Sequence, residues 1–377
     1  MREADALVVH LVPALFDAND GIIGGAERYA LELARHMADV VPTRLVTFGA
    51  RDREERLDRL AIRVIGGAWR VRGQRSNPLA VAMLPELRSA AIVHCHQQHV
   101  LMSSIAALTM RLLRRRVFCT DLGGGGWDVS AYVSTDRWFH GHLHISEYSR
   151  RIAGHTGAPW ARVVFGGVDG ERFCPDGSTP SGGTVLFVGR LLPHKGVNDL
   201  VDAIEPGVRA ELIGPVHGPR YRQELALRAR GKQIVFREGC DDAALVEAYR
   251  RAACVVLPSV YRDLYGHETR VPELLGQTLL EGMACGRPTI CTNVASLPEI
   301  VEHGVTGLVV PPNDPPALQS AIRWLFDHPD QAAEMGRRGR ERALAKFNWR
   351  TVVDGCLDAY GMPVVSRTEE SWLTGTS

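Results

Sequence analysis

Strand-length apolar runs alternate with longer helical patterns along most of the chain, and this alternation restricts the fold more than any other feature. A first series starts with ALVVHLV at 6–12, passes through the helical pattern GGAERYALELARHMADV at 24–40, and continues in RLVTFG, AIVHCHQ and RVFCTD. A second series runs from TVLFVGR at 184–190 to GLVVPP at 307–312. Such alternation is typical of parallel sheets with crossover helices. We therefore predict two α/β domains in tandem.

The segment CPDGSTPSGG between the two series is rich in Pro, Gly and Ser and has no periodicity, which is typical of a linker. A chain of 377 residues is long enough for two domains of ordinary size. We place the first domain at 1–173, the linker at 174–183 and the second domain at 184–345. A helical pattern at 346–363 is expected to pack back on the first domain. The polar residues 364–377 are predicted to form a disordered tail.

The composition excludes several classes of protein. With 45% hydrophobic and 23% charged residues, the chain has no apolar run near the roughly 18 residues that span a bilayer. The first residues lack the pattern of a signal peptide, so we expect a cytoplasmic protein. A net charge of +1 is too small to indicate nucleic-acid binding. The eight cysteines form no Cys-x-x-Cys pair and are predicted to be buried free thiols.

Two histidine-rich segments and one arginine cluster are further candidate sites. HCHQQH at 94–99 and HGHLH at 140–144 could supply zinc ligands, but neighbouring side chains on a strand point to opposite faces, so no metal site is predicted. MRLLRRRVF at 110–118 could rest on an anionic membrane or form a solvated helix end, and both interpretations stay open. Its cations are Arg111, Arg114, Arg115 and Arg116.

In an open parallel sheet, ligands bind beyond the carboxyl ends of the strands, so the residues that follow each strand are the candidates. Gly24 and Gly25 lead directly into a helix whose N-terminus could receive an anion, although a tight turn would explain them equally well. Four consecutive glycines at 123–126 indicate either a close backbone approach to a ligand or a flexible loop. The motifs Gly-x-Gly-x-x-Gly and Gly-Lys-Ser/Thr are absent, which disfavours a dehydrogenase or an ATPase.

Arg190 and Lys195 follow the first strand of the second series. The chain has only three lysines, so a lysine on this loop suggests a cation that meets a phosphate, although chance placement is the alternative. No Asp-x-Asp pair lies nearby, which favours neutralisation of a diphosphate by side chains and not by a divalent metal. Further along, Glu273 and Glu281 bracket a short helix start, where Thr278-Leu-Leu-Glu281 reads as a capping box.

Taken together, these segments resemble a family 4 retaining glycosyltransferase (glycosyl transferases group 1) with the GT-B fold. The resemblance extends over nearly the full length: GGAERYALELARHMA near the start, VVFGGVDGERFCP at 163–175, VLFVGRLLPHKGVNDLVDAI at 185–204, and most specifically PELLGQTLLEGMACGRPTICTNVASLPEIVEHGVTGLVVPPND at 272–314. It implies two Rossmann-like, doubly wound domains that face each other across a cleft, with an acceptor-binding first domain and a donor-binding second domain. It also implies a hexosyltransferase (EC 2.4) that needs no metal.

The resemblance also assigns roles to the candidate residues. Glu281 should bind the ribose of the nucleotide sugar, and Glu273 should lie by the donor sugar. Arg190 and Lys195 should bind the diphosphate, assisted by backbone amides near the helix start and by the first glycine pair. The donor-binding candidates are Gly24, Gly25, Arg190, Lys195, Leu275, Gly276, Gln277, Thr278 and Glu281; the catalytic candidates are Glu273, Arg190, Lys195 and Asp121. No enzymic nucleophile is required, since the leaving phosphate helps to deprotonate the acceptor.

The sequence departs from the family at two places. Where members often have Thr-x-His, this chain has Leu122, so the role of that His is either absent or taken by Asp121, Asp128 or His96. The loop VYRDLYGHETRV at 260–271 is longer than in many members, and it either selects the sugar through Tyr265, His267, Glu268 and Arg270 or is only a longer loop. The acceptor-side candidates are His96, Gly123, Gly124, Trp127 and Asp128.

Two other functions remain open: a nucleotide-sugar epimerase of the same fold, and a non-catalytic nucleotide-sugar binding protein. The acceptor is expected to be a glycan, a lipid-linked glycan or a small molecule, in the biosynthesis of a surface polysaccharide or a natural product. The sequence does not specify the donor base, the sugar or the oligomeric state.

Overall fold

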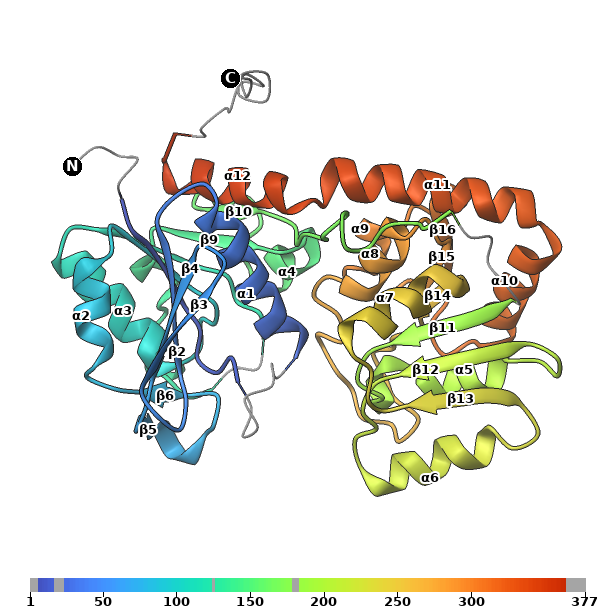
Figure 1. Ribbon diagram of the computed structural model, residues 1–377. Helices are drawn as coiled ribbons and strands as arrows, with labels where there is room; N and C mark the ends of the chain where they lie inside the picture. The colour runs from blue at the N-terminus through green and yellow to red at the C-terminus, as the bar shows by residue number, and fades with distance from the viewer. Residues whose placement is uncertain (1–5, 17–23, 124–125, 178–182, 364–377) are drawn as a thin grey trace, which may run out of the picture. The chain divides into compact units, whose positions relative to one another are not determined.

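The structure is a computed structural model that describes residues 6–16, 24–123, 126–177 and 183–363 (Figure 1). The chain forms two compact units. Unit 1 consists of Met1–His144, Thr156–Val164 and Arg350–Ser377, and unit 2 of Ile145–His155 and Phe165–Trp349. Residues 145–155 and 165–173, which the sequence placed in the first domain, group with unit 2. The predicted tail and half of the predicted linker, residues 178–182, lie outside the described residues.

Unit 1 is built around an eight-stranded sheet that is parallel except for its edge strand β3, which pairs antiparallel with β4. Its strands, in spatial order, are β10 (Ala161–Val163), β9 (Gly141–His144), β8 (Arg116–Cys119), β7 (Ile92–Cys95), β1 (Val8–Leu11), β2 (Thr43–Phe48), β4 (Leu60–Ile65) and β3 (Arg53–Leu57). Its main helices are α1 (Gly25–Ala38), α2 (Met83–Ser89), α3 (Leu101–Leu112) and nearly all of α12 (Trp349–Tyr360). A small β5 (Trp69–Arg70) and β6 (Pro78–Leu79) ribbon pairs separately.

Unit 2 contains a six-stranded sheet that is parallel throughout. Its strands, in spatial order, are β13 (Gln233–Arg237), β12 (Arg209–Ile213), β11 (Thr184–Val188), β14 (Ala252–Leu257), β15 (Thr289–Thr292) and β16 (Gly307–Val310). Its helices are α4 (Glu147–Ile152), α5 (Val197–Ala203), α6 (Pro219–Arg228), α7 (Asp242–Arg251), α8 (Gln277–Ala284), α9 (Leu297–Ile300), α10 (Pro315–Asp327) and α11 (Pro329–Lys346).

Both sheets start in the middle and grow in both directions. In unit 2 the strands β11, β12 and β13 follow one another in one direction across the sheet. The chain then crosses back, and β14, β15 and β16 follow on the other side of β11. In unit 1, β2 and β4 lie on one side of β1, and β7, β8, β9 and β10 on the other. This is the order of a doubly wound Rossmann-like sheet, and the strand order reverses between β11 and β14 and between β1 and β7. The predicted pair of parallel-sheet domains is therefore confirmed.

The strands are apolar because helices cover both faces of a parallel sheet, and their buried residues form the core of each unit. Six of the eight free cysteines belong to these interiors, while Cys174 and Cys240 are half-buried. Burial raises the pKa of the Cys254 thiol to about 12, so this thiol stays protonated and packs as a small apolar group. The prediction of buried free thiols holds for six of the eight.

Helices α8 and α11 of unit 2 approach each other through glycine. A Cβ atom on Gly336 of α11 would lie 2.1 Å from the carbonyl oxygen of Gly286, just beyond α8. Three residues along, Gly339 faces the side chain of Met283. The guanidinium of Arg340 also donates to the carbonyl of Ala284, at the last turn of α8. Glycine therefore sets how closely α11 supports the helix on which Glu281 lies.

Replacing Gly336 by alanine tests this contact. Alanine normally stabilises a helix by about 1 kcal/mol relative to glycine, but here the overpacking should outweigh that gain and lower the free energy of unfolding by roughly 1–3 kcal/mol. Denaturant unfolding followed by circular dichroism measures the change. Gly25→Ala is the matched control, because a Cβ atom there would meet nothing within 4 Å. A Gly336→Ala protein as stable as the wild type would contradict the close approach.

Candidate functional site

The loops that follow β11 and β14 meet at the point where the strand order of unit 2 reverses. The amide of Val260 donates to the carbonyl of His194, with an N–O distance of 2.9 Å. Gly196, which precedes α5, has a φ of 64°, and a Cβ atom there would lie 1.9 Å from the carbonyl oxygen of Pro258. Only glycine fits this approach, because a side chain would collide with backbone. The two loops are thereby held together at the carboxyl edge of the sheet.

An ion pair joins the two loops at this place. The ammonium of Lys195 contacts Oε1 of Glu273 and also lies 3.3 Å from the carbonyl oxygen of Pro272. The hydroxyl of Ser259 donates to the same Glu273 oxygen at 2.8 Å. The two charged side chains are only 16% and 10% exposed, so each depends on the other for compensation of its charge. The sequence anticipated both residues separately, but not their pairing.

One further cation and one neutral histidine lie on the same loop as Lys195. Arg190 is exposed on the loop after β11. His194 lies between Arg190 and Lys195 in sequence, and its pKa is lowered from the ordinary value by burial and by the nearby ammonium of Lys195. His194 is therefore neutral at neutral pH. Positive charge at this edge thus comes from Arg190 and Lys195, as the sequence suggested, and Glu273 partly compensates it.

The start of α8 differs from the sequence prediction. Gly276, with a φ of 89°, is the N-cap residue, and the helix begins at Gln277. Thr278 is therefore the second helical residue and caps nothing, so the predicted capping box is wrong. The positive φ of Gly276 turns the chain into the helix without a side-chain cap. The first amides of α8, at Gln277 and Thr278, have no partner within the helix and can face a ligand.

Glu281 lies one turn into α8 and is 5% exposed. Its Oε2 accepts a hydrogen bond of 2.6 Å from the hydroxyl of Tyr249, a fully buried residue of α7. The carboxylate is thus held by an aromatic residue 32 positions away that the sequence analysis did not single out. Among the other residues of this segment, Leu275 is buried, and the side-chain amide of Gln277 donates to the carbonyl of Gly167 at 3.1 Å.

The long loop at 260–271 is well structured. Asp263 accepts hydrogen bonds from the amides of Tyr265 and His267, and Arg262 forms a 2.9 Å ion pair with Glu268. Its last part is held by the hydroxyl of Tyr148, which donates to the carbonyl of Arg270. Of the four side chains predicted as sugar-selecting candidates, Tyr265 is half-buried, and the other three are exposed: His267, Glu268 and Arg270. The segment between β14 and Glu273 is thus a loop whose conformation is fixed by hydrogen bonds and an ion pair.

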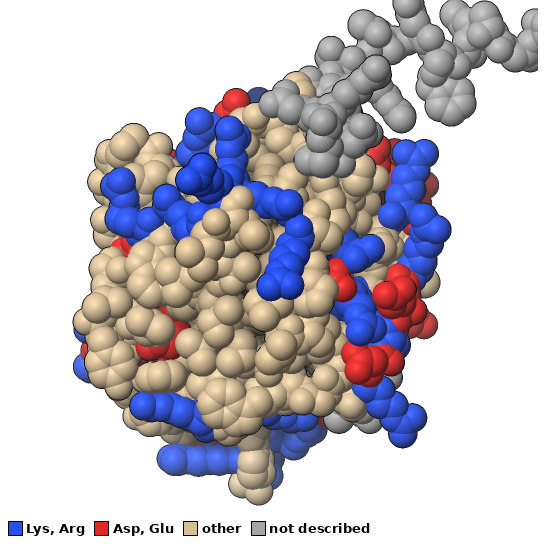
Figure 2. Space-filling view, turned by 90° about the vertical axis from the view of Figure 1, so that its left-hand side faces the viewer, with Lys and Arg blue, Asp and Glu red and all other residues tan. Residues whose placement is uncertain are grey.

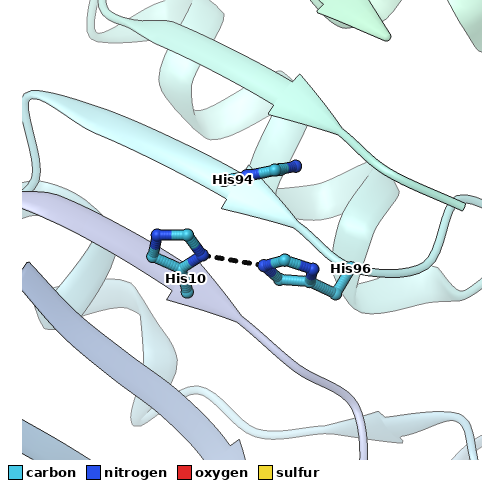
Figure 3. A group of neighbouring side chains, drawn as sticks. All are labelled: His10, His94 and His96. Atoms are coloured by element: carbon cyan, nitrogen blue, oxygen red, sulfur yellow. Dashed lines mark hydrogen bonds between the residues drawn. The ribbon is translucent and has the colours of Figure 1, made fainter. Parts of the chain in front are cut away.

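Three histidines meet where the strand order of unit 1 reverses (Figure 3). His10 on β1 and His94 on β7 are register partners on neighbouring strands, and His96 follows two residues after His94. One ring nitrogen from each lies within 4.8 Å of the others. The prediction that strand alternation would separate the histidines is wrong for this group, because residues two apart share a face of a strand. His10 was missed because it stands alone in its apolar strand.

The histidines are neutral and hydrogen-bonded. His10 Nδ1 lies 2.8 Å from His96 Nε2, and His10 Nε2 lies 3.2 Å from the sulfur of Met37. The two nitrogens of His94 pair with the hydroxyls of Thr120 and Tyr360, at 2.8 and 2.6 Å. Burial lowers the pKa of His10 to about 3. Burial, together with neighbouring histidines, also lowers the pKa values of His94 and His96 well below the ordinary range.

His96 forms part of the wall of a pocket at this carboxyl edge. The pocket is lined by residues 12–14 after β1, 26–27 at the start of α1, Ser76, 96–97 after β7, and 122–123 after β8. Leu122 and Gly123, at the departure from the family pattern, are therefore pocket residues. Gln97 is fixed by donation from its side chain to the carbonyl of Gly123 at 3.0 Å.

The remaining candidates of unit 1 have structural contacts. Asp128 is buried and accepts hydrogen bonds from Ser130 and from the hydroxyl of Ser104. Trp127 packs against the guanidinium of Arg72, 4.3 Å from its ring centre. Asp121 accepts a long 3.4 Å hydrogen bond from the amide of Gln98.

The glycine pair leads into α1 as predicted, with Gly24 as the N-cap residue and Gly25 as the first helical residue. A Cβ atom on Gly24 would lie 3.1 Å from a carboxylate oxygen of Glu27, so the helix N-terminus already has negative charge beside it. Gly24 and Gly25 belong to unit 1, whereas the other donor-binding candidates belong to unit 2. Gly124 lies outside the described residues.

Comparison with known proteins places the charged site within a recognised domain. Residues 177–342 match the family model described as Glycosyl transferases group 1. The D-rhamnosyltransferase WbpZ of Pseudomonas aeruginosa is 36% identical over 166 residues, which are 43% of this chain and 41% of that protein. A D-inositol 3-phosphate glycosyltransferase of Saccharomonospora viridis is 33% identical over 227 residues, or 53% and 49%. The chain spans about half the length of these curated relatives, or less.

Solved structures resemble the chain over nearly its whole length. Alr3699/HepE of Anabaena, in complex with UDP and glucose, has a TM-score of 0.71 at 17% identity and covers 94% of this chain and 99% of its own. Sucrose-phosphate synthase of Thermosynechococcus elongatus has a TM-score of 0.70 at 20% identity, with 94% and 98% covered. The chain therefore has the GT-B fold of two Rossmann-like units, and its residues 177–342 match the glycosyl transferases group 1 family.

Proposed function

We propose that the protein transfers a sugar from a nucleoside-diphosphate sugar to an acceptor hydroxyl, with retention of the anomeric configuration and without a metal ion. The observation that supports this most is the Lys195–Glu273 pair at the reversal of strand order in unit 2, within the group 1 domain. An ammonium for phosphate and a carboxylate for a sugar are placed side by side there. Donor-bound enzyme would use both in one reaction.

The donor diphosphate would bind to Arg190, Lys195 and the first amides of α8. Cations at this position stabilise the charge that grows on the departing nucleoside diphosphate, and this charge is larger in the transition state than in the bound donor. The amides of Gln277 and Thr278 add the positive end of a helix dipole. Glu281 would accept hydrogen bonds from ribose hydroxyls, with Tyr249 holding its carboxylate in place.

Glu273 would stabilise the donor sugar electrostatically and bind one of its hydroxyls. Among the described residues, both contacts of its side chain use Oε1, which leaves Oε2 for a ligand. During transfer the bond between the anomeric carbon and the diphosphate oxygen breaks, and the acceptor oxygen forms its bond on the same face of the sugar. The proton of the acceptor hydroxyl passes to the leaving phosphate. A nucleophile from the protein is not needed.

The names of related proteins suggest a donor and a biological setting. The relatives include a D-rhamnosyltransferase, a glycogen synthase and a D-inositol 3-phosphate glycosyltransferase. The Anabaena protein was solved in complex with UDP and glucose. We propose a uridine diphosphate hexose as the first donor to test, and a role in surface glycan or natural-product biosynthesis in the cytoplasm. No helix within the described part of the chain is long and apolar enough to span a bilayer.

The arginine cluster at the end of α3 supports a peripheral contact with an anionic membrane. Three of its guanidiniums donate to backbone carbonyls: Arg111 to Trp138, Arg115 to Ala90 and Arg116 to Tyr360. These bonds fix the side chains in place but leave their charge intact. Beside them Leu112 is 86% exposed. The side of unit 1 that bears α2 and α3 shows a largely uncharged area with arginine side chains near its edges (Figure 2).

Substitution of Glu273 tests the catalytic proposal. Glu273→Gln keeps the size of the side chain and can still accept from Ser259, but it removes the negative charge from the sugar site. We expect kcat for transfer from the donor to fall by about 100-fold or more, with unchanged affinity for the free nucleoside diphosphate. Glu211→Gln is the matched control, since Glu211 on β12 is a carboxylate of similar exposure, 13%, that forms an ion pair with Arg237 on β13. A kcat for Glu273→Gln within threefold of wild type would contradict the proposal that Glu273 stabilises the donor sugar during transfer.

Nucleotide binding tests the donor class and the metal independence together. UDP, GDP, ADP and dTDP, with their hexoses, should be compared by thermal shift in the presence and absence of EDTA. At 100 times its dissociation constant, the correct ligand stabilises the protein by about 2.7 kcal/mol. We expect the same shift with and without EDTA, and a smaller one in Lys195→Met. Stabilisation by none of these ligands contradicts the proposed function; stabilisation lost with EDTA contradicts the metal-free site.

Membrane contact is tested by co-sedimentation with phosphatidylglycerol-containing vesicles. Leu112→Glu should reduce the bound fraction, because it removes an exposed apolar side chain and adds a like charge near the anionic lipid. Binding should also fall as salt screens the arginines. Leu227→Glu, at an exposed leucine of α6, is the control and should bind as the wild type does. Equal binding of both variants would argue against membrane contact through the arginine cluster and Leu112.

A further inference from the structure

Two cysteines of unit 2 lie on neighbouring segments of the chain. Cys174 is half-buried, whereas Cys285 is the C-cap residue of α8 and is fully buried. Nη1 of Arg340 donates to the backbone carbonyls of both residues that directly precede these cysteines. The residues that follow the cysteines also touch, since a Cβ atom on Gly286 would lie 3.4 Å from Cγ of Pro175. The two segments are therefore in contact on both sides of the cysteines, which places Cys174 opposite Cys285.

Two arginine guanidiniums lie close to these thiols. Arg250, near the end of α7, has its Nη2 3.4 Å from Sγ of Cys174, and its Nε donates to the carbonyl of the same cysteine at 2.9 Å. Arg287 is 6% exposed, and its Nε has no hydrogen-bond partner among the described residues. Burial raises the pKa of Cys285 to about 12, and the charges of Arg250 and Arg287 oppose this effect. A guanidinium beside an accessible sulfur stabilises negative charge there, so Cys174 is the thiol suited to attack an oxidant.

The cysteines are also connected to the carboxylate of Glu281. The amide of Cys285 donates to the carbonyl of Glu281, one helical turn earlier, at 3.0 Å. Phe173, the residue before the other cysteine, packs its ring edge-on against the ring of Tyr249, with the ring centres 5.7 Å apart. The hydroxyl of Tyr249 in turn holds the carboxylate of Glu281. A change at either cysteine therefore reaches the groups that position Glu281.

We propose that Cys174 and Cys285 form a peroxide-sensitive dithiol, which closes to a disulfide and thereby weakens nucleotide binding to unit 2. The effect on nucleotide binding rests on the proposed function, whereas disulfide formation does not. In the first step the thiolate of Cys174 attacks one oxygen of hydrogen peroxide. The O–O bond breaks, and the departing hydroxide takes up a proton and becomes water. The sulfur of Cys174 is thereby oxidised to a sulfenic acid.

The second step forms the cross-link. The sulfur of Cys285 attacks the sulfur of the sulfenic acid, the S–O bond breaks, and hydroxide leaves as water with the proton of Cys285. One peroxide and two thiols thus give one disulfide and two waters. A disulfide requires Cα atoms within about 7 Å, which suits two segments that touch on both sides of the cysteines. The bond draws the sulfur of Cys174 from Arg250 toward α8 and so disturbs the ring contact of Phe173 with Tyr249.

The other cysteines do not combine access with a facing thiol in this way. Cys95 and Cys119 are register partners on β7 and β8, but both are fully buried, so a peroxide reaches neither. Cys240 is half-buried, and Nη1 of Arg237 lies 3.8 Å from its sulfur. It lies at the start of α7, whereas Cys174 lies near the end of this helix, roughly 15 Å away at 1.5 Å per residue. Cys240 is therefore a matched control thiol, accessible and beside an arginine.

Mapping of the oxidised full-length chain tests the disulfide without any substitution. Reduced protein is treated with hydrogen peroxide, and its free thiols are counted with a maleimide after denaturation. We expect the loss of two of the eight thiols and the joining of tryptic peptides 173–190 and 271–323, with fragmentation placing the bond at Cys285 and not at Cys291. Dithiothreitol should restore all the thiols. Retention of all eight thiols, or a bond between other cysteines, overturns the proposal.

Single substitutions separate the two steps. In Cys285→Ala the sulfenic acid at Cys174 has no thiol opposite it, so dimedone should label Cys174. In Cys174→Ala neither a disulfide nor a dimedone adduct at Cys285 should form. Cys240→Ala should form the same disulfide as the wild type. The absence of a dimedone adduct in Cys285→Ala, or an adduct at Cys285 in Cys174→Ala, contradicts the order of the steps.

Nucleotide affinity separates this inference from the proposed function. Titration with UDP should show about tenfold weaker binding to the oxidised than to the reduced wild type, which is within the usual range of coupling between sites. Cys174→Ala should bind UDP equally before and after peroxide treatment. Equal affinity of the oxidised and reduced wild type contradicts the coupling to Glu281. A protein that forms the disulfide but binds none of the four nucleoside diphosphates would keep the dithiol and lose the proposed function.

Discussion

Parallel strands can be joined only by crossovers, and this constraint decides where chemistry can occur in both units. In each sheet the chain starts in the middle and changes direction once, beside β1 in unit 1 and beside β11 in unit 2. At that place two neighbouring loops leave the sheet toward opposite faces, and side chains from distant parts of the sequence converge. Lys195 and Glu273 meet there in unit 2, and His10, His94 and His96 meet there in unit 1.

The two sites are electrostatically different. In unit 2 an ammonium and a carboxylate compensate each other at a nearly buried position, and an exposed arginine adds further positive charge. Such a site favours a ligand that carries both phosphate and hydroxyl groups. In unit 1 burial keeps three histidines neutral beside a pocket at the carboxyl edge of the sheet.

Glycine at a few positions makes these arrangements sterically feasible. Gly196 lets the two loops of unit 2 come within hydrogen-bonding distance, Gly276 turns the chain into α8, and Gly336 lets α11 pack directly on the end of α8. In each case either a Cβ atom would collide with backbone or the φ angle is positive. The side chains of the candidate site are of common types, and the backbone around them fixes their positions.

The sequence by itself determined the two parallel-sheet units, the loops that would carry function and the identity of the charged residues at the carboxyl edge of unit 2. These follow from local periodicity, since alternation and apolar runs report on burial within a few residues. The capping box at Thr278 was wrong because the φ angle of Gly276, which the sequence does not state, set the start of the helix. Only the tertiary structure decided that Lys195 pairs with Glu273 across 78 positions, that Tyr249 holds Glu281, and that His10 joins His96 across 86 positions. Such contacts depend on strand order and register, which bring distant segments together and leave no trace in the local pattern.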